Sequence, residues 1–370
     1  MKRILNIVGA RPNFVKMAPI VRALEQRGEQ FVQKLVHTGQ HYDDRMSAIF
    51  FRDLKLPIPD VNLNVGSGSH AQQTAAAMVR LEPLLQEFRP DIVIVVGDVN
   101  STLAGALTAK KLGLRVAHVE AGLRSFDMSM PEEINRLCTD SISDVLFTTD
   151  KIADANLLRE GIPAERIHFV GNVMIDSLLA CRDFACEERF YEKLGLQPKA
   201  YATLTLHRPS NIDNAEALEE ILGALFENIQ DMPIIFPVHP RARQRVKEFG
   251  FDRYFTDKLG AKGILMTEPL SYIEFLNLNM FSRLVLTDSG GVQEETTILE
   301  VPCVTLRKNT ERPITITEGT NHLGGVTRES IKAAIRAALV DTPGRVRNPE
   351  LWDGKAAERI VDVIASVCRM

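Results

Sequence analysis

The run Ile92–Val96 limits the fold of this chain more than any other segment. It reads Ile-Val-Ile-Val-Val, so every residue is β-branched and apolar. Such a strand is buried on both faces, which is typical of a parallel strand with helices on either side of the sheet. The segment therefore predicts a central strand of an α/β fold.

Short apolar runs alternate with helical patterns along almost the whole chain. In the first half we expect strands at residues 4–8, 31–36, 92–96, 116–119, 145–147 and 167–170, with helices near 71–88 and 101–112. In the second half we expect strands at residues 202–206, 234–238, 264–266, 284–286 and 304–306, with helices near 215–228, 272–278, 292–300 and 330–339. This repetition predicts two doubly wound parallel sheets, each Rossmann-like, with right-handed crossovers.

The length of 370 residues suits two domains of ordinary size. A helical pattern from residue 174 onwards breaks at Gly195 and Pro198. We therefore expect a first domain over residues 1–173 and a second domain over residues 174–354. The helix expected within residues 355–370 would return to the first domain.

The composition argues against several classes of protein. A net charge of -4 gives no basic footprint for nucleic acid. No apolar run approaches the ~18 residues of a membrane span, and no signal cleavage pattern follows the first strand. The five cysteines form no CxxC pair, which favours reduced thiols in a cytoplasm and no structural zinc.

Polar residues gather where the predicted strands end. The segments are Gly9-Ala-Arg-Pro, His37-Thr-Gly-Gln-His, Gly97-Asp98, His118-Val-Glu120, Gly171-Asn172, His207-Arg208, His239-Pro-Arg241 and Asp288-Ser-Gly-Gly. In open α/β sheets, ligands bind outside the carboxyl ends of the strands. Two such sheets would line one interdomain cleft from both sides, and we expect the active site there.

Residues 284–295 contain the clearest single binding pattern. An apolar strand leads into the turn Asp-Ser-Gly-Gly at residues 288–291, and a helical pattern follows from Val292. Glycines beside a helix N-terminus let backbone N–H groups bind a phosphate. Glu295, one turn into the helix, is placed to meet ribose hydroxyls. An ordinary strand–helix turn is the alternative interpretation.

Three carboxylate positions in the first half suit a proton-transfer enzyme. Asp98 follows the central strand, Glu120 closes the strand at 116–119, and Glu132 follows a helix-starting proline. Crowded carboxyl groups can differ in pKa, so that one is protonated while another acts as a base. Asp98 could instead neighbour a helix cap, and Glu132 could belong to an ordinary acidic first turn.

Basic side chains offer contacts for anions. Arg11 and Lys16 flank the first strand–helix turn and suit a diphosphate, although a solvated surface pair fits equally well. His207 and His239 follow equivalent strands of the second half, which favours phosphate contact or acid–base work. His37 lies four residues before His41, but an intervening glycine favours a loop, so we expect no metal site.

Three common motifs are missing from the sequence. No Walker lysine motif is present, no GxGxxG opens the first helix, and no Gly-x-Ser-x-Gly elbow occurs. The sequence thus gives no support for a P-loop, a nicotinamide fingerprint or serine hydrolysis.

Across these segments the chain resembles the non-hydrolysing UDP-N-acetylglucosamine 2-epimerases over nearly its whole length. The resemblance rests on the strand-end segments above together with Ala121-Gly-Leu-Arg124, Pro131-Glu-Glu-Ile-Asn-Arg136, Ile175-Asp176, Val292-Gln-Glu-Glu295 and Thr310-Glu-Arg-Pro313. It implies a GT-B-type fold, a homodimer and a UDP-N-acetylhexosamine substrate, with no cofactor. It also implies that UDP leaves C1 as the C2 proton is removed. UDP would then add back to a 2-acetamidoglucal, with a proton delivered to the opposite face.

The resemblance also implies roles for individual residues. The expected catalytic residues are Asp98, Glu120, Glu132 and His207. The expected substrate or UDP contacts are Arg11, Lys16, Arg136, His239, Phe275, Ser289, Gly290, Gly291, Glu295 and Arg312. Gln40 and His41 match a loop through which a second substrate molecule activates some bacterial members.

Other functions stay open at this point. Residues 125–131 resemble relatives that epimerise UDP-linked diacetamido uronic acids. Hydrolysis to free N-acetylmannosamine and UDP, or glycosyl transfer, would use the same kind of cleft. A UDP-sugar sensor without catalysis is the non-enzyme alternative, and the three retained carboxylates argue against it.

Overall fold

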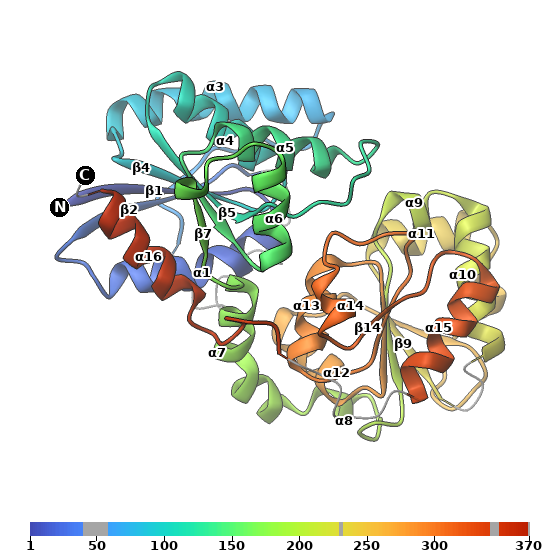
Figure 1. Ribbon diagram of the computed structural model, residues 1–370. Coiled ribbons are helices and arrows are strands. Elements are labelled where there is room, and N and C mark those ends of the chain that lie inside the picture. Colours follow the sequence, from blue (N-terminus) through green and yellow to red (C-terminus); the bar gives the residue numbers. More distant parts are fainter. Residues whose placement is uncertain (40–57, 229–231, 341–347, 369–370) are drawn as a thin grey trace. The chain divides into compact units, whose positions relative to one another are not determined.

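The computed structural model describes residues 1–39, 58–228, 232–340 and 348–368 (Figure 1). The chain forms two compact units. Unit 1 comprises Met1–Ala180 and Glu350–Met370, and unit 2 comprises Cys181–Pro349. Each unit contains one seven-stranded sheet whose strands pair in parallel. The prediction of two doubly wound parallel sheets is therefore confirmed.

The sheet of unit 1 has the order β3-β2-β1-β4-β5-β6-β7. Its strands are β1 (Lys2–Val8), β2 (Phe31–His37), β3 (Val61–Asn62), β4 (Ile92–Val96), β5 (Arg115–Ala121), β6 (Val145–Thr148) and β7 (Ile167–Phe169). All five residues of β4 are buried, as its β-branched sequence predicts. The strand order reverses between β1 and β4, and such a reversal opens a crevice at the carboxyl ends of the strands.

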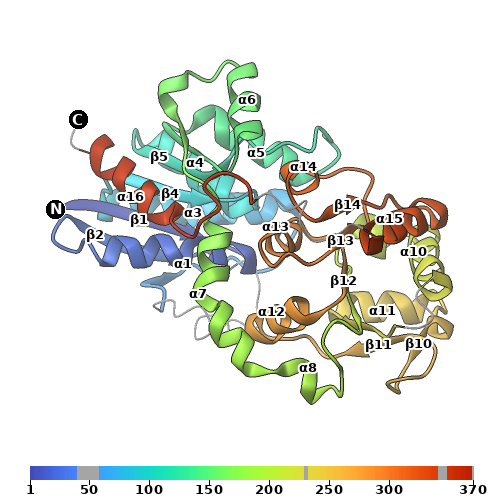
Figure 2. The ribbon, with the colours of Figure 1, turned by 60° about the horizontal axis from the view of Figure 1, so that its bottom comes forward.

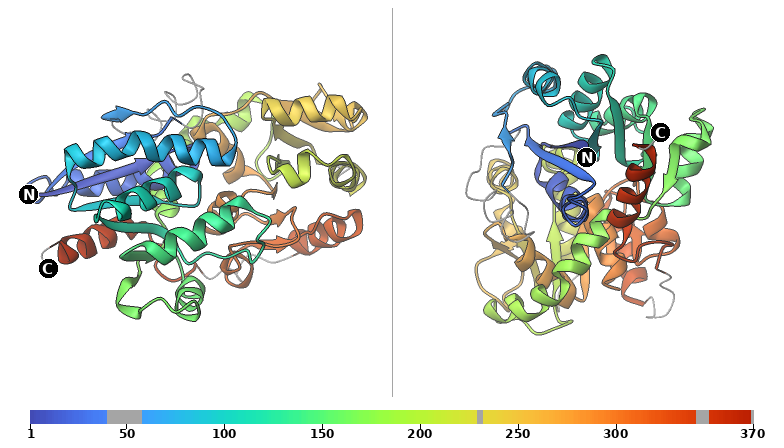
Figure 3. Two further views of the ribbon diagram at one scale, coloured as in Figure 1. Left: turned by 90° about the horizontal axis from the view of Figure 1, so that it is seen from above. Right: turned by 90° about the vertical axis from the view of Figure 1, so that its left-hand side faces the viewer.

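Helices cover both faces of this sheet. They are α1 (Arg11–Glu25), α3 (His70–Phe88), α4 (Asn100–Lys111), α5 (Pro131–Ile142), α6 (Lys151–Arg159), α16 (Ala356–Val367) and the first half of α7 (Val173–Glu188), which continues into unit 2 after Ala180. Helix α4 packs between α3 and α5 (Figure 3). On the other face α1 packs against α16 (Figure 2). The Asp176 carboxylate accepts the N–H groups of Ala356 and Ala357 at 3.1 and 2.7 Å, which fastens α16 to this unit.

The sheet of unit 2 has the order β10-β11-β9-β8-β12-β13-β14. Its strands are β8 (Ala202–Thr205), β9 (Ile234–Pro237), β10 (Phe255–Thr256), β11 (Ile264–Thr267), β12 (Leu284–Thr287), β13 (Cys303–Thr305) and β14 (Asn321–Leu323). Its helices are α8 (Phe190–Lys193), α9 (Pro209–Ile212), α10 (Ala215–Asn228), α11 (Pro240–Glu248), α12 (Tyr272–Phe281), α13 (Gly290–Ile298), α14 (Ile314–Thr317) and α15 (Arg328–Val340). The order again reverses between the first strand, β8, and its neighbour β12, so this unit has a crevice of the same kind.

The main core of unit 2 lies between the sheet and helices α10, α11 and α15. Leu204 and Phe236 of the sheet meet Leu222 and Ile335 of the helices there. A smaller cluster on the other face joins Val285 of β12 to Val292 of α13 and Phe275 of α12. These cores fix α13 at the end of β12, where the binding pattern was predicted.

Among the described residues, no helix combines the length and the apolar character that crossing a membrane requires. All five cysteines are free thiols.

Candidate active site

The carboxyl ends of β1, β4 and β5 bring Lys16, Asp98 and Glu120 to one edge of the unit 1 sheet. The turn at Gly97 is their common neighbour. Gly97 has a φ of 70°, and its N–H donates to the Val119 carbonyl at 3.0 Å. A Cβ at this position would lie 3.2 Å from Lys16 Nζ and 3.3 Å from Glu120 Oε2. Glycine thus permits both the turn and the close approach of these two side chains.

Glu120 has an unusual backbone conformation. Its φ is 72°, and the pairing of β5 with β6 shifts register between Val119 and Ala121. Such a bulge redirects a side chain, and its strain is typical of functional sites. The Glu120 carboxylate forms a salt bridge with Lys16 Nζ, and both side chains are buried. Lys16 is therefore a buried cation and does not belong to a solvated surface pair.

Asp98 is held by a buried arginine. Arg136 Nη1 lies 2.5 Å from Asp98 Oδ2, and the same guanidinium also pairs with Glu133. Asp98 remains 24% exposed on its side chain, whereas Arg136 is almost fully buried. The predicted contact of Arg136 with the substrate thus stays a prediction. The carboxylates that Arg136 binds in the structure, Asp98 and Glu133, both belong to unit 1.

Glu133 anchors the loop that precedes α5. Its carboxylate accepts the N–H groups of Ser125 and Phe126 at 3.0 and 2.9 Å. Burial alone would raise the Glu133 pKa, but the hydrogen bonds from Ser125 and Arg136 lower it on balance. Glu133 lies in the acidic first turn of α5, as predicted. Its carboxylate also holds Arg136, the guanidinium that binds Asp98.

Glu132 occupies the same first turn of α5 and is partly exposed. In the part of the chain that the structure describes, its carboxylate has no hydrogen bond or ion pair, so the structure does not join it to Asp98 or Glu120. The side chain of Arg11 and the whole of Gln40 and His41 lie outside the described residues.

Unit 2 presents a histidine–aspartate pair at the equivalent edge of its sheet. His207 Nδ1 lies 2.7 Å from Asp288 Oδ1, and the His207 side chain is 54% exposed. Asp288 is fully buried and accepts the N–H groups of His207 and Arg208 at 3.1 and 3.0 Å. Burial alone would raise the Asp288 pKa, but the His207 ring and these N–H groups lower it on balance. Asp288 therefore orients an imidazole that stays accessible to a ligand.

Helix α13 begins next to this pair. Ser289 precedes the helix, and Gly290 and Gly291 are its first residues. The first N–H groups of a helix have no intrahelical partner, so they can bind an anion. A Cβ at Gly290 would lie 2.9 Å from Glu311 Oε1 and 3.0 Å from Arg312 Cζ, so glycine lets these side chains approach the helix start.

A cluster of arginines surrounds Glu311 beside the start of α13. Glu311 lies 3.1 Å from Arg208, 2.8 Å from Arg307 and 3.0 Å from Arg312. Arg312 also bonds to Glu294 at 3.0 Å. The guanidinium groups of Arg208, Arg307 and Arg312 lie together beside the helix start, and such clustered cations favour a bound diphosphate.

Glu295 and Phe275 lie between α13 and α12. Tyr272 Oη donates to Glu295 Oε1 at 3.0 Å. Burial raises the Glu295 pKa to about 7; the Tyr272 hydrogen bond opposes this shift and the Glu294 charge adds to it. Phe275 packs against Val285 and Val292 and is partly exposed.

His239 has a clear local role. Its exposed side chain caps α11, because Nδ1 accepts the Arg241 N–H at 3.3 Å. The structure therefore shows a helix cap here, and the predicted ligand contact of His239 stays a prediction.

The pairing of His207 with Asp288 could not be read from the sequence. It depends on β8 lying next to β12, where Thr205 pairs with Thr287. Arg208, Glu311 and Tyr272 carried no periodic signal either. Only the family segments His207-Arg208 and Thr310-Glu-Arg-Pro313 marked their neighbourhood.

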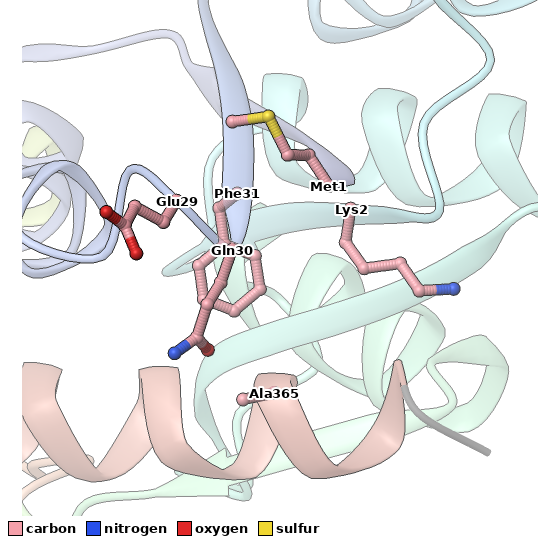
Figure 4. Close-up of a pocket in the computed structure, with 6 residues that line it drawn as sticks. All are labelled: Met1, Lys2, Glu29, Gln30, Phe31 and Ala365. Carbon is pink, nitrogen blue, oxygen red and sulfur yellow. The ribbon is translucent and has the colours of Figure 1, made fainter.

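A surface hollow elsewhere in unit 1 differs from this site (Figure 4). It is lined by Met1, Lys2, Glu29, Gln30, Phe31 and Ala365. These residues lie at the amino ends of β1 and β2, together with α16. Ligands of open α/β sheets bind at the opposite, carboxyl edge, so the hollow is no candidate for the active site.

With this geometry established, comparison with known proteins assigns the family. The profile of the family described as UDP-N-acetylglucosamine 2-epimerase matches residues 22–365. The chain belongs to this family, and the resemblance found in the sequence is confirmed.

Individual relatives agree over nearly their full lengths. The chain is 46% identical to the UDP-N-acetylglucosamine 2-epimerase of Methanocaldococcus jannaschii, covering 97% of both chains. It is 40% identical to the UDP-2,3-diacetamido-2,3-dideoxy-D-glucuronate 2-epimerase of Pseudomonas aeruginosa, covering 99% of this chain and 100% of the relative. A crystal structure of the M. jannaschii enzyme in complex with UDP-GlcNAc and UDP superposes with a TM-score of 0.90 at 46% identity, covering 98% of this chain and 99% of that one. The expected GT-B-type fold is confirmed by these likenesses.

Proposed function

We propose that this protein interconverts UDP-N-acetylglucosamine and UDP-N-acetylmannosamine by inverting C2 of the sugar. The observation that carries the proposal is the arrangement around Gly97. Two carboxylates, Asp98 and Glu120, flank this glycine; Glu120 is paired with the buried Lys16, and Asp98 with the buried Arg136, which Glu133 shares. Two acid–base groups at one edge suit a reaction that removes a proton and delivers another. The enzymes named above act on UDP-linked 2-acetamido sugars, which supports the substrate class.

The proposed reaction is an elimination followed by an addition. One carboxylate takes the proton from C2, and the C–H electrons form a C1–C2 double bond. The C1–O electrons leave with UDP, which gives a 2-acetamidoglucal bound beside UDP. UDP then adds back to C1 as a second carboxyl group protonates the opposite face of C2. Asp98, Glu120 and Glu132 are the proposed acid–base groups.

Unit 2 is proposed to retain UDP while the C1–O bond is broken. The start of α13, with Ser289, Gly290 and Gly291, would bind the diphosphate together with Arg312. His207, oriented by Asp288, would stabilise the negative charge that develops on the leaving UDP. Glu295 is the proposed ribose ligand, and Phe275 is proposed to lie near the uracil.

The remaining predicted contacts are proposed on the family resemblance. Arg11 and Lys16 would meet the diphosphate from unit 1, with Lys16 also serving Glu120. Arg136 would act mainly through Asp98, and His239 would contact UDP. Gln40 and His41 would belong to an allosteric site for a second substrate molecule. We also propose that the protein is a homodimer in the cytoplasm. Residues 1–173 and the C-terminal helix would form the catalytic domain, and residues 174–354 would form the UDP-binding domain.

Inversion by elimination and addition is redox-neutral, so the proposed reaction requires no cofactor.

A second candidate substrate is a UDP-linked diacetamido uronic acid. The P. aeruginosa relative that carries this activity in its name is 40% identical over 372 residues. The segment Ser125–Pro131, which Glu133 anchors beside Asp98, resembles that group of relatives. The chemistry at C2 would be the same with either substrate.

Incubation with UDP-N-acetylglucosamine in deuterated water, followed by NMR, tests the proposal. We expect deuterium at C2 and a UDP-linked manno epimer. Release of free N-acetylmannosamine would identify a hydrolysing enzyme. Unchanged substrate would refute the proposed activity on UDP-N-acetylglucosamine, and the uronic acid substrate would then separate a different specificity from a sensor or a transferase.

A further inference from the structure

His118 is a buried titratable group that the proposed reaction does not use directly. It lies in β5, two residues before Glu120, and it is fully buried. Its Nδ1 is 2.6 Å from Asp140 Oδ1, and its Nε2 is 2.8 Å from the carbonyl oxygen of Gly97. The ring therefore bridges helix α5 and the turn that carries Asp98.

Both ring nitrogens of His118 face an acceptor. The Gly97 carbonyl can only accept, so Nε2 must carry a proton. Asp140 also lies 2.7 Å from Arg124 Nη2 and accepts the Gly122 N–H at 3.0 Å. The guanidinium charge of Arg124 and these two donated hydrogen bonds favour the ionised form of the Asp140 carboxylate. An ionised carboxylate only accepts, and Nδ1 must therefore carry a proton as well.

The surrounding charges balance an imidazolium ion at this place. Arg124 also pairs with Glu160 at 2.7 Å. The cations Arg124 and His118 are thus matched by the anions Asp140 and Glu160. A buried charge is tolerated where it is paired and hydrogen-bonded in this way.

The Gly97 turn is held at several points. Its N–H donates to the Val119 carbonyl at 3.0 Å, and the Asn135 amide donates to the Asp98 carbonyl at 2.8 Å. His118 supplies the one charged donor among these bonds, and charge-assisted hydrogen bonds are about twice as strong as neutral ones. The same turn lies against the Glu120 carboxylate, so its position affects both proposed acid–base groups.

We propose that His118 is a positioning residue, a buried imidazolium whose Nε2–H fixes the Gly97 carbonyl and thereby places Asp98 and Glu120 for catalysis. The kinetic part of this inference rests on the proposed epimerase function. The protonation state of His118 and its bond to Gly97 are independent of that function.

Two substitutions separate the bond to Gly97 from the bond to Asp140. In His118→Gln the amide nitrogen can reach the place of Nε2 and donate to Gly97 without a charge. In His118→Asn the amide reaches only the place of Nδ1, so the bond to Gly97 is lost. We expect kcat to fall about 100-fold in His118→Asn, the cost of a small misplacement of catalytic groups, and no more than about 10-fold in His118→Gln. The dissociation constant of UDP should change less than about 2-fold in both variants, because no residue proposed to bind UDP in unit 2 is altered.

His168→Gln provides a matched control. His168 lies in β7 of the same unit and is half-buried, with the Phe147 ring 6.0 Å away. The kcat of the His168→Gln variant should stay within about 2-fold of that of the unaltered enzyme, because His168 makes no hydrogen bond to the Gly97 turn. Equal loss of kcat in the Asn and Gln variants, in proportion to their loss of folded protein, would overturn the positioning role.

Nitrogen-15 NMR of the histidine rings tests the charge state without any activity assay. In the unaltered protein, the resonances that disappear in both His118 variants should show a proton on each ring nitrogen at neutral pH. A ring with one unprotonated nitrogen would contradict the inference. If the unaltered protein has this imidazolium but epimerises no UDP-sugar, the proposed function fails while the assignment of His118 as a buried imidazolium stands.

Discussion

Asp98 and Asp288 occupy equivalent places in the two units, each just past the strand that neighbours the first strand of its sheet. Asp98 keeps 24% of its side chain exposed and is held by one guanidinium. Asp288 is fully buried and binds the exposed His207. An aspartate just past such a strand is thus available to a substrate in unit 1 and orients another side chain in unit 2. Burial decides between these two uses.

The same contrast extends to the neighbouring charges. Unit 1 has the buried one-to-one pair of Lys16 with Glu120, and Asp98 with Arg136 beside it. Unit 2 has three arginines clustered around Glu311. Two carboxylates at one sheet edge suit proton transfer, and clustered guanidinium groups suit the retention of a diphosphate. Substitutions in each unit test these two proposed roles, proton transfer in unit 1 and UDP retention in unit 2.

The largest effect is expected for Glu120→Gln. It should lower kcat about 1,000-fold, since it removes an acid–base group. It also leaves Lys16 buried without its charge partner, which should reduce the free energy of unfolding by about 3–5 kcal/mol. Steady-state kinetics and urea unfolding measure the two effects.

The double variant Lys16→Met with Glu120→Gln is the control for stability. Replacing both charges should restore most of the unfolding free energy, because no lone buried charge remains. It should not restore kcat. Recovery of activity in the double variant would show that Glu120 acts only as a partner of Lys16.

Asp288→Asn should have the next largest effect. The asparagine amide would turn donors toward the N–H groups of His207 and Arg208, which costs about 1–3 kcal/mol of stability. His207 would lose its orientation, and we expect kcat to fall about 100-fold with weaker UDP binding. Calorimetry with UDP measures the binding change. An unchanged UDP affinity together with an unchanged kcat would contradict the role given to unit 2.

Gly97→Ala tests the close approach of Lys16 and Glu120 to the turn before Asp98. Alanine at a φ of 70° should cost about 1–2 kcal/mol, and its Cβ would press on Lys16 and Glu120. Gly113→Ala is a matched control, because Gly113 has a φ of 73° with nothing within 4 Å of the added atom. Both variants should lose similar stability, and only Gly97→Ala should lose activity, by about 10-fold. Equal activities would show that the approach at Gly97 has no catalytic importance.

Glu295→Gln should change the pH dependence of stability in unit 2. Burial and the Glu294 charge raise the Glu295 pKa from 4.5 to about 7 in the folded protein. The folded protein therefore holds a proton that the unfolded chain has lost between these pH values. The contribution of this group is full below pH 4.5 and is lost as the pH rises to about 7, by up to about 3 kcal/mol.

Urea unfolding at pH 5 and pH 8 measures this difference. The unaltered protein should lose more stability between these values than the Glu295→Gln variant. Glu216→Gln, which changes an exposed acid of α10, should behave like the unaltered protein. An equal pH dependence in all three proteins would contradict the raised pKa of Glu295.

The sequence predicts the regular parts of this fold well, because burial leaves a periodic pattern. The strand at Ile92–Val96 and the helix Ala215–Asn228 have the predicted bounds, and the helix Ala356–Val367 lies within the predicted range 355–370. The strands β3, β10 and β14 have only two or three residues each, too few to show a pattern, and they were not predicted. Helix α13 begins at Gly290, two residues earlier than its apolar pattern indicated, because glycines carry no hydrophobic signal.

The site could be predicted only in part. The position of Asp98, Glu120 and His207 follows from the rule that ligands meet the carboxyl ends of parallel strands. The partners of these residues depend on which strands are neighbours and on the exposure of each side chain. The sequence left Lys16 open between a diphosphate contact and a solvated surface pair, and it did not show that a bulge at Glu120 turns a carboxylate toward this lysine. Such pairings appear only when the strand order is known.

In the proposed reaction, the carboxylates of unit 1 move the C2 proton while unit 2 retains UDP. Exchange of deuterium into C2 of UDP-N-acetylglucosamine by an Asp98→Asn variant tests it most directly. Asp98 is exposed enough to meet a substrate, and the neutral amide cannot act as a base. We predict that C2 exchange falls at least about 100-fold while UDP binds with unchanged affinity. Exchange at the rate of the unaltered enzyme would contradict the claim.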